Sequence, residues 1–413
     1  MRDLLPPEAD AWEWVRSVHK RVASLYGYRQ VVTPVIETAA LFPQEGLPET
    51  AMYRFNDHAG RPLVLRPDGV SGVLRAVHDA PARQRRPLRL RYAGPMFRYS
   101  RPQHGIRREF THLGLECIGT TSLYADVEVI EAGVHFTREL GLDDVTVFVN
   151  TVGDEVDRHL YKARLTEYFG GLVDQLCERC RRRLHDDPRR ILACPLEPTL
   201  VATAPVWLET ISDASRQRLE SVLDLLRSSG VPYDVRPSLV RGPSYYIHTV
   251  FTFMLALPDA GPFDIGGGER YDLLAERLAL PPTPGVGCVF GVERMLEAVM
   301  ARSSRHQDAA GSEIMVLALS PGEMKYAADI ARRLRADGLR VEMDLDCDRR
   351  PERRLRLASL GHVRFAVLVG QDEERANRAV VRDLGSRLQV ATTSRDLPAV
   401  IRRLRSGASL GTD

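Results

Sequence analysis

The arginines between residues 88 and 118 are the side chains whose type and spacing most directly suggest chemistry. Arg98, Arg101, Arg107 and Arg108 lie within one short segment of the chain. A guanidinium fork matches phosphate oxygens in pairs, so clustered arginines on a rigid support suit the binding of a polyanion. A solvated basic hairpin would have the same composition, and the segment alone leaves both interpretations open.

Two strands are predicted to support this basic loop. Apolar and basic residues alternate over LRLRY, residues 88–92, with the period of two that a half-buried strand needs. After the turn-prone RPQHG, residues 110–116 (FTHLGLE) are again typical of a strand. We therefore expect a β-hairpin that carries the arginines around one end.

Three other segments offer weaker signals. Residues 53–69 predict a hairpin with a turn at 58–61, and the following turn presents Asp68, whose carboxylate could meet a ligand's amine. Glycines 266–268 permit close approach of a ligand or of a neighbouring strand. Arg294 follows a glycine-spaced strand, near the start of a helix, from which it could reach a phosphate. A plain turn, a packed strand and a surface ion pair explain the same patterns.

The cysteines are a candidate metal site that the sequence does not favour. Cys177 and Cys180, with His185 and Cys194 nearby, have the residue types of zinc ligands. The first two lie in a helical pattern and no second close pair follows, so packed thiols are the simpler interpretation. We expect no metal bound by protein cysteines. Six cysteines at irregular spacing in a chain this long indicate reduced thiols and hence the cytoplasm.

Composition limits the classes of protein that fit. The 413 residues suit two or three domains, and 44% hydrophobic with 27% charged residues is typical of a globular protein. Because the net charge is only +2, any contact with nucleic acid must come from local patches. No apolar run approaches the roughly 18 residues of a spanning helix, so we expect no membrane partner.

The remaining elements divide the chain into blocks. Residues 7–26 predict an amphipathic helix, and RQVVTPVIETAALF predicts an edge strand closed by Pro34. From about 161 to 236 the pattern is helical, which suggests a module inserted into a strand-rich domain. Residues 301–312 are a polar linker. Beyond it strands alternate with helices, which predicts a small α/β domain with a largely parallel sheet, and we expect a binding module.

Five segments, in order, resemble motifs of the histidyl-tRNA synthetase family of class II aminoacyl-tRNA synthetases. VVTPVIE resembles the first class motif, with its dimer-interface proline at Pro34; FRYSRPQHGIRREF resembles the second and GVGCVFGVERM the third. LVRGPSYYIHTVF and GGGERYDLL resemble the two histidine-specific segments. The resemblance covers nearly the whole chain.

The resemblance implies an α+β fold and a homodimer. A catalytic domain with an antiparallel sheet would span residues 1–152 and 237–300, interrupted by a helical insertion at 153–236. The linker at 301–312 would lead to an anticodon-binding-like α/β domain at 313–413.

The resemblance also implies roles for single residues in adenylation of an amino acid by ATP and Mg²⁺, followed by transfer to a tRNA. Arg98 and Arg241 would clamp the α-phosphate, Arg294 would hold the γ-phosphate, and Phe110 would stack on adenine. The other residues implied at the ATP site are Ser100, Arg107 and Arg108. Those implied around the amino acid are Asp68, Val70, His112, Glu116, Arg241, Ser244, Tyr245, Tyr246, Glu269 and Tyr271. Arg101 and Gln103 would lie in the loop that meets the tRNA acceptor end.

Several positions depart from the family's motifs, most of them around the amino acid. Ser100 replaces a glutamate of the second motif, and Ile106 an arginine. In the amino-acid pocket the departures are Asp68 for glutamate, Val70 for threonine, His112 for glutamine, Pro243-Ser244 for leucine-aspartate, and Glu269 for glycine. A site that loses side-chain partners loses about 10⁴-fold or more in discrimination.

Three functions therefore remain open. The first is a ligase that adenylates an amino acid other than free histidine and transfers it to a tRNA or a small amine. The second is a divergent histidine–tRNA ligase. The third is a catalytically silent paralogue that regulates another protein, as the ATP phosphoribosyltransferase regulatory subunit does. Retention of Arg98, Arg241 and Arg294 favours the enzymes, whereas Ser100 and Ile106 favour the silent paralogue.

Overall fold

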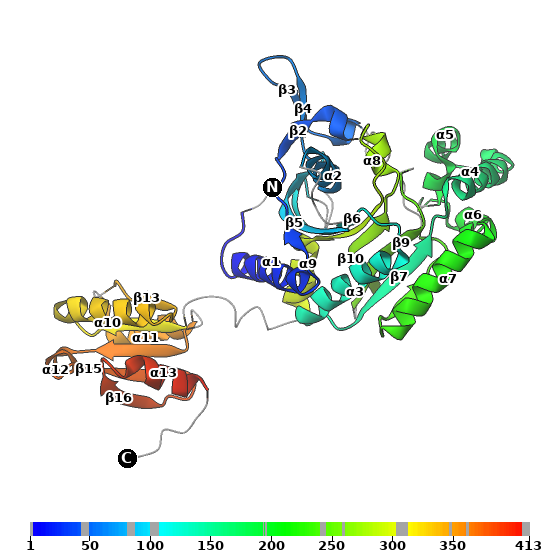
Figure 1. Ribbon diagram of the computed structural model, residues 1–413. Helices are drawn as coiled ribbons and strands as arrows, with labels where there is room; N and C mark the ends of the chain where they lie inside the picture. The colour runs from blue at the N-terminus through cyan, green and yellow to red at the C-terminus, as the bar shows by residue number, and fades with distance from the viewer. Residues whose placement is uncertain are drawn as a thin grey trace. The chain divides into compact units, whose positions relative to one another are not determined.

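The chain folds into two compact units, residues 1–308 and 309–413 (Figure 1). The structure is a computed structural model. It describes residues 3–42, 49–80, 87–99, 107–192, 194, 196–239, 245–257, 261–302, 313–346, 349–360 and 363–406.

An eight-stranded sheet is the centre of the first unit. Across the sheet the strands are β1 (Arg29–Gln30), β5 (Leu88–Phe97), β6 (Glu109–Ile118), β11 (Gly285–Gly291), β10 (Gly261–Arg270), β9 (Thr249–Leu257), β7 (Val145–Thr151) and β8 (Tyr233–Val235). All neighbours are antiparallel except the two outermost pairs, β1–β5 and β7–β8. This confirms the predicted α+β class with an antiparallel catalytic-type sheet.

Helices cover one face of this sheet, where the main core lies. They are α1 (Glu8–Leu25), α3 (Leu123–Glu139), α7 (Asp213–Ser228) and α9 (Val292–Arg302), and the first, second and fourth lie together in Figure 1. Leu113, Leu115 and Cys117 of β6 enter this core. Because strand side chains alternate, the residues between them point to the opposite face.

Smaller elements border that opposite face. Strands β2 (Ile36–Thr38), β3 (Arg54–Asn56) and β4 (Pro62–Leu65) form an antiparallel sheet. The other elements here are the 3₁₀ turns η1 (Ala39–Leu41) and η2 (Glu49–Ala51) and the helices α2 (Val70–Asp79) and α8 (Leu274–Arg277). The predicted hairpin of residues 53–69 is confirmed. The predicted strand around Pro34 is two strands, β1 and β2, because proline cannot donate to a ladder.

The helical block has its own small core, which includes Tyr161, Phe169 and Trp207. Its elements are α4 (Glu155–Gly170), η3 (Val173–Gln175), α5 (Glu178–Asp186), η4 (Pro188–Ile191), α6 (Pro198–Ala202) and η5 (Trp207–Glu209). Helix α7 packs instead against the main core through Leu219 and Val222, and β8 extends the main sheet. These last elements therefore belong with the large sheet, although their sequence continues the helical block.

The second unit is a five-stranded sheet with helices, in the strand order β13-β12-β14-β15-β16. Its elements are β12 (Ile314–Ala318), η6 (Pro321–Glu323), α10 (Met324–Ala336), β13 (Val341–Met343), α11 (Pro351–Leu360), β14 (Phe365–Val369), α12 (Gln371–Arg375), β15 (Arg378–Asp383), β16 (Gln389–Thr393) and α13 (Leu397–Arg405). The first three strands are parallel, whereas β15 and β16 add antiparallel, which corrects the expectation of a largely parallel sheet. None of the helices in the described residues is long and apolar enough to cross a membrane.

Candidate active site

The β5–β6 hairpin provides the floor of the candidate site. Phe110, His112 and Glu116 alternate with residues of the main core, so they point to the face that the large helices leave free. Directly across the hairpin, Tyr92 pairs with Gly114. The predicted hairpin is confirmed, and its register brings aromatic, basic and acidic groups to one surface.

Two carboxylates flank a glycine in one row of the sheet. Glu116 on β6 pairs with Gly287 on β11, which in turn pairs with Glu269 on β10. Residues directly opposite each other place their side chains on the same face. A Cβ built at Gly287 would lie 1.8 Å from Glu116 Oε2, so the Glu116 carboxylate lies directly over the glycine.

Glu116 is the most strongly perturbed acid of the site. It is 2% exposed, and the Tyr271 hydroxyl donates to its Oε2 at 2.6 Å. Burial raises the pKa of Glu116 to about 8, with the charges of Glu269 and Asp68 adding to the rise and the Tyr271 bond opposing it. A cationic ligand group would favour the ionised carboxylate, so this end of the site suits an amine or another cation.

Arg98 joins the hairpin to the turn that carries Asp68. Its Nε donates to the carbonyl of Pro67 at 2.9 Å, while Asp68 Oδ1 accepts from the Ser71 amide at 3.3 Å. Burial raises the pKa of Asp68, and the nearby Arg98 charge partly offsets this. The Arg98 guanidinium carbon lies 5.4 Å from the centre of the Phe110 ring, within cation–π range. A basic group and an acidic group thus stand side by side.

His112 is held neutral beside them. Burial, then the positive charges of Arg98 and Arg66, lower the pKa of His112 to about 3. Its ring centre is 4.9 Å from that of Phe110, and its Nδ1 finds no hydrogen-bond partner among the described residues. A neutral imidazole with a free nitrogen can accept or donate one hydrogen bond to a ligand.

The two tyrosines before β9 close another side of the site. The rings of Tyr245 and Tyr246 are 4.8 Å apart, and Tyr245 is 8% exposed. Arg158 of α4 donates to the Tyr246 carbonyl at 2.6 Å, which ties the helical block to the site. Burial, followed by the charge of Asp68, raises the pKa of Tyr245, so its phenol stays protonated and can donate.

Arg294 is held at a different place, by β10. Its Nη1 lies 3.0 Å from the carbonyl of Asp264 and 3.3 Å from the carboxylate of the same residue. The preceding Glu293 accepts the Thr111 amide at 3.0 Å, which docks α9 onto the start of β6. Arg294 is 38% exposed and so remains open to a ligand.

Phe110 lies near Arg98 and His112, Tyr246 adjoins Tyr245, and Arg294 lies against β10. The other predicted residues divide into three groups. Those brought together around the acidic row are Asp68, Arg98, His112, Glu116, Tyr245, Glu269 and Tyr271. Val70 begins α2 close to Asp68, while Arg107 and Arg108 follow the loop, the latter with its guanidinium 4.7 Å from the Tyr99 ring centre. The third group lies outside the described residues and keeps its predicted roles as predictions: Ser100, Arg101, Gln103, Arg241 and Ser244.

Two positioning residues escaped the sequence analysis. The Tyr92 ring fills the space between two glycines, since a Cβ at Gly69 or at Gly114 would lie 2.3 or 2.2 Å from it. Arg66 is 7% exposed and donates to the carbonyls of Thr33 and Pro95, both at 2.9 Å, which fixes the turn before Asp68. In the sequence, Gly69 and Gly114 could have indicated a close approach of another group. Only the fold shows that this group is the Tyr92 ring.

The antiparallel sheet with its basic hairpin, and the second α/β unit, define a class II aminoacyl-tRNA synthetase fold. The family model "Histidyl-tRNA synthetase" matches residues 1–166, and "Anticodon binding domain" matches residues 313–404. The histidine–tRNA ligase of Bacillus velezensis is 33% identical over 393 residues, which cover 92% of each chain. That of Pelotomaculum thermopropionicum is 34% identical over 98% of this chain and 96% of the relative.

Solved structures share this fold. Histidyl-tRNA synthetase of Staphylococcus aureus has a TM-score of 0.78 at 27% identity, over 97% of both chains. A Bacillus halodurans protein titled ATP phosphoribosyltransferase regulatory subunit/histidyl-tRNA synthetase shares the fold, with a TM-score of 0.64 at 23% identity over 90% of this chain and 97% of that one. This chain belongs to the histidyl-tRNA synthetase family.

Proposed function

We propose that the chain is an ATP-dependent ligase that adenylates an amino acid other than free histidine and transfers it to a tRNA or a small amine. The observation that carries the proposal is the position of Glu269, beside Gly287 and in one row with Glu116. The family's motif has a glycine where Glu269 stands. A carboxylate there takes up space and adds an acceptor where the family leaves room for its own substrate.

The phosphate end of the site supports adenylation. In this reaction a carboxylate oxygen attacks the α-phosphorus of ATP, pyrophosphate leaves, and a mixed anhydride with AMP forms. The protein needs mainly to align the reactants and to place positive charge on the developing phosphorane. Arg98 is anchored for this by the Pro67 carbonyl, and Arg294, in the segment that resembles the third motif, has a partly exposed side chain. ATP would enter as its magnesium complex, which is a substrate rather than a resident group.

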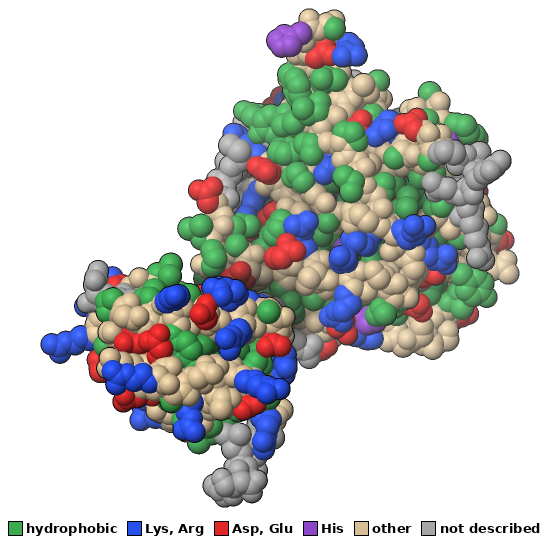
Figure 2. Space-filling model, turned by 60° about the vertical axis from the view of Figure 1, so that its left-hand side comes forward, with side chains coloured by type: hydrophobic (Ala, Val, Ile, Leu, Met, Phe, Trp, Pro, Cys, Tyr) green, Lys and Arg blue, Asp and Glu red, His purple; other side chains and the backbone are tan. Residues whose placement is uncertain are grey.

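The acceptor and partners follow from the family. The second unit matches an anticodon-binding model, which favours a tRNA as the acceptor. A homodimer is favoured by the apolar residues near the first motif: Val32 is 83% exposed, Ile36 49% and Phe55 41%. Figure 2 shows hydrophobic side chains gathered below the protruding end of hairpin β3–β4. Cytoplasmic location remains part of this proposal.

A second candidate is a divergent histidine–tRNA ligase. Identity of 33% over 92% of a curated histidine–tRNA ligase favours it, as does the Glu116–Tyr271 pair, which keeps the family's residue types. A silent regulatory paralogue has weaker support. Its basis is a similarity of fold, whereas the chain retains the anticodon-binding-like unit that such subunits usually lack.

Amino-acid-dependent ATP–pyrophosphate exchange tests the proposal. The full-length protein is assayed with magnesium ATP and each amino acid in turn, with and without bulk tRNA. We expect exchange with one amino acid other than histidine. Exchange with histidine alone would establish the second candidate. Absence of exchange, together with absence of ATP binding by calorimetry, would indicate the silent paralogue.

A further inference from the structure

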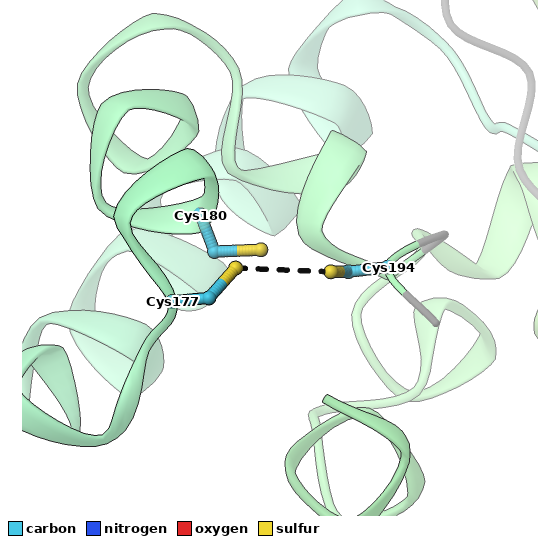
Figure 3. Close-up of side chains that lie close together, drawn as sticks. All are labelled: Cys177, Cys180 and Cys194. Atoms are coloured by element: carbon cyan, nitrogen blue, oxygen red, sulfur yellow. Dashed lines mark hydrogen bonds between the residues drawn. The ribbon is translucent and has the colours of Figure 1, made fainter. Parts of the chain in front are cut away.

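Three thiols meet in the helical block, away from the candidate active site. Cys177 is the N-cap of α5, Cys180 lies in the first turn of that helix, and Cys194 follows η4. Their sulfur atoms all lie within 4.8 Å of one another. In Figure 3, Cys177 and Cys180 point from the same helix end toward Cys194.

The spacing of the sulfurs suits a shared cation better than a disulfide. The Sγ atoms of Cys177 and Cys194 are 4.0 Å apart. Zinc binds thiolates at about 2.3 Å in a tetrahedron, which places two ligand sulfurs about 3.8 Å apart. A disulfide would require about 2.05 Å. The observed distance is therefore close to one edge of a zinc tetrahedron.

Positive charge lies near the thiols. The guanidinium of Arg183 is close enough to Cys194 to interact with it electrostatically. A positive helix end also lies beside Cys177, because this residue caps the N-terminus of α5. Glu197 fixes the position of the first thiol by accepting the Cys177 amide at 2.6 Å.

The three thiols can all ionise only beside a cation. Their sulfur atoms lie within 4.8 Å of one another. Three thiolates this close repel one another, so without a positive ion only a fraction of them can ionise. A divalent cation removes the repulsion, and the positive charge of Arg183 balances the single negative charge left by three thiolates and one zinc ion.

The helical block also has a structural use for such an ion. Apart from α4 it consists of short helices and turns, and its core is one small cluster that includes Cys180 and Cys194. Small modules with little core are commonly stabilised by a metal or a disulfide. The three thiols link α5 to the segment after η4, across 17 residues of the chain.

We propose that Cys177, Cys180 and Cys194 bind one zinc ion, which fastens α5 to the segment after η4. A solvent molecule completes the four ligands, because His185 is exposed and lies outside the cluster. The proposal replaces the expectation from sequence that these are only packed thiols. The sequence alone does not show that Cys194 lies beside the Cys177–Cys180 pair.

Metal analysis of the full-length protein, purified under reducing conditions, is the first test. We expect about one zinc per chain, lost in Cys177→Ser and in Cys194→Ser. Cys117→Ser is the matched control, since it removes another buried thiol from the large sheet. The control should retain its zinc. An equal loss of metal in the control would overturn the assignment.

Cobalt uptake keeps the test decisive if the serine variants fail to fold. The wild-type protein is stripped with a chelator, reduced and titrated with Co²⁺, which reports thiolate ligation by charge-transfer absorption. We expect a tetrahedral cobalt spectrum that Zn²⁺ abolishes. In parallel, Trp207, which lies in the same small core, should change its fluorescence on stripping when Trp12 and Trp14 are replaced by phenylalanine. A protein that takes up neither ion, or that yields a Cys177–Cys194 disulfide, would overturn the proposal.

Discussion

At the scale of single residues, the carboxylates of Glu116 and Glu269, on either side of Gly287, determine which ligand the site suits. Glu116 keeps the family's residue type and its bond to Tyr271, whereas Glu269 is the departure that shares its row. Gly287 between them has no room for a side chain because of the Glu116 carboxylate. The resemblance implied Glu116, Glu269 and Tyr271 at the amino acid but not Gly287, and the row depends on the register of three strands, which the sequence does not show.

Replacing Glu269 tests whether it sets the substrate. Glu269→Gly combined with Ser244→Asp restores the family's residue types, so we expect histidine-dependent ATP–pyrophosphate exchange to rise by about 10-fold or more. Glu269→Gln is the matched control, because it removes the charge and keeps the size. If histidine-dependent exchange stays absent in the double variant, the identity of the pocket is not what excludes histidine.

Ionisation of Glu116 should make the folded state less stable as pH rises. Its pKa is raised to about 8 in the folded protein, against 4.5 as its ordinary value. Between these values the folded state binds more protons than the unfolded state, so stability falls by about 1.4 kcal/mol for each pH unit. Glu116→Gln should remove this slope in urea unfolding measured at pH 5, 6.5 and 8. Equal slopes in the wild type and the variant would show that Glu116 ionises normally.

At the scale of elements, local patterns predicted more than long-range pairing did. The apolar stripe of residues 7–26 predicted α1 nearly to its ends, whereas the alternation in LRLRY predicted only the first half of β5, which continues to Phe97. The β15–β16 hairpin was missed, because its outer strand has the half-exposed pattern of an edge and little apolar signal. The packing of α7 against the main core was not predicted either. Its apolar stripe predicts a helix but does not show which core that helix covers.

Helix α1 carries a histidine that should weaken the protein in acid. His19 is 1% exposed, packs edge-on to Phe136 with 5.4 Å between ring centres, and has no hydrogen-bond partner among the described residues. Burial, then the charge of Arg91, lowers its pKa to about 3 from 6.5. The unfolded chain therefore binds the proton first, and stability is lost as pH falls below 6.5.

His19→Leu should remove that loss. Between pH 8 and pH 5, we expect the free energy of unfolding of the variant to rise by about 2 kcal/mol relative to that of the wild type. The reason is that the unfolded variant has no imidazole at position 19 to bind a proton. Urea unfolding at both pH values measures the difference. A stability difference that is the same at pH 5 and pH 8 would contradict the assigned pKa.

At the scale of the whole molecule, the chain has two units with separate cores. The change of pattern beyond the polar linker at residues 301–312 predicted a separate C-terminal domain, and the resemblance implied a role for each unit. The sequence offered Cys177, Cys180 and Cys194 as possible ligands but favoured packed thiols, because only the fold of the helical block shows that Cys194 reaches the other two.

Separate cores predict separable functions. A chain ended after Arg302 should fold and retain amino-acid-dependent exchange, because the candidate site lies entirely in the first unit. Its affinity for bulk tRNA should fall by about 10-fold or more, and the salt dependence of binding should become shallower as phosphate contacts are lost. Filter binding at two salt concentrations, beside the full chain, measures both. Unchanged tRNA affinity would mean that the second unit is not the RNA-binding part.

The most direct test of the proposed function is mass spectrometry of the small molecules that the protein retains. Full-length protein is incubated with magnesium ATP and an equimolar mixture of the protein amino acids, then filtered and denatured. The proposal predicts one aminoacyl adenylate whose mass differs from that of histidyl adenylate. Histidyl adenylate as the sole product, or unreacted ATP without any adenylate, would contradict it.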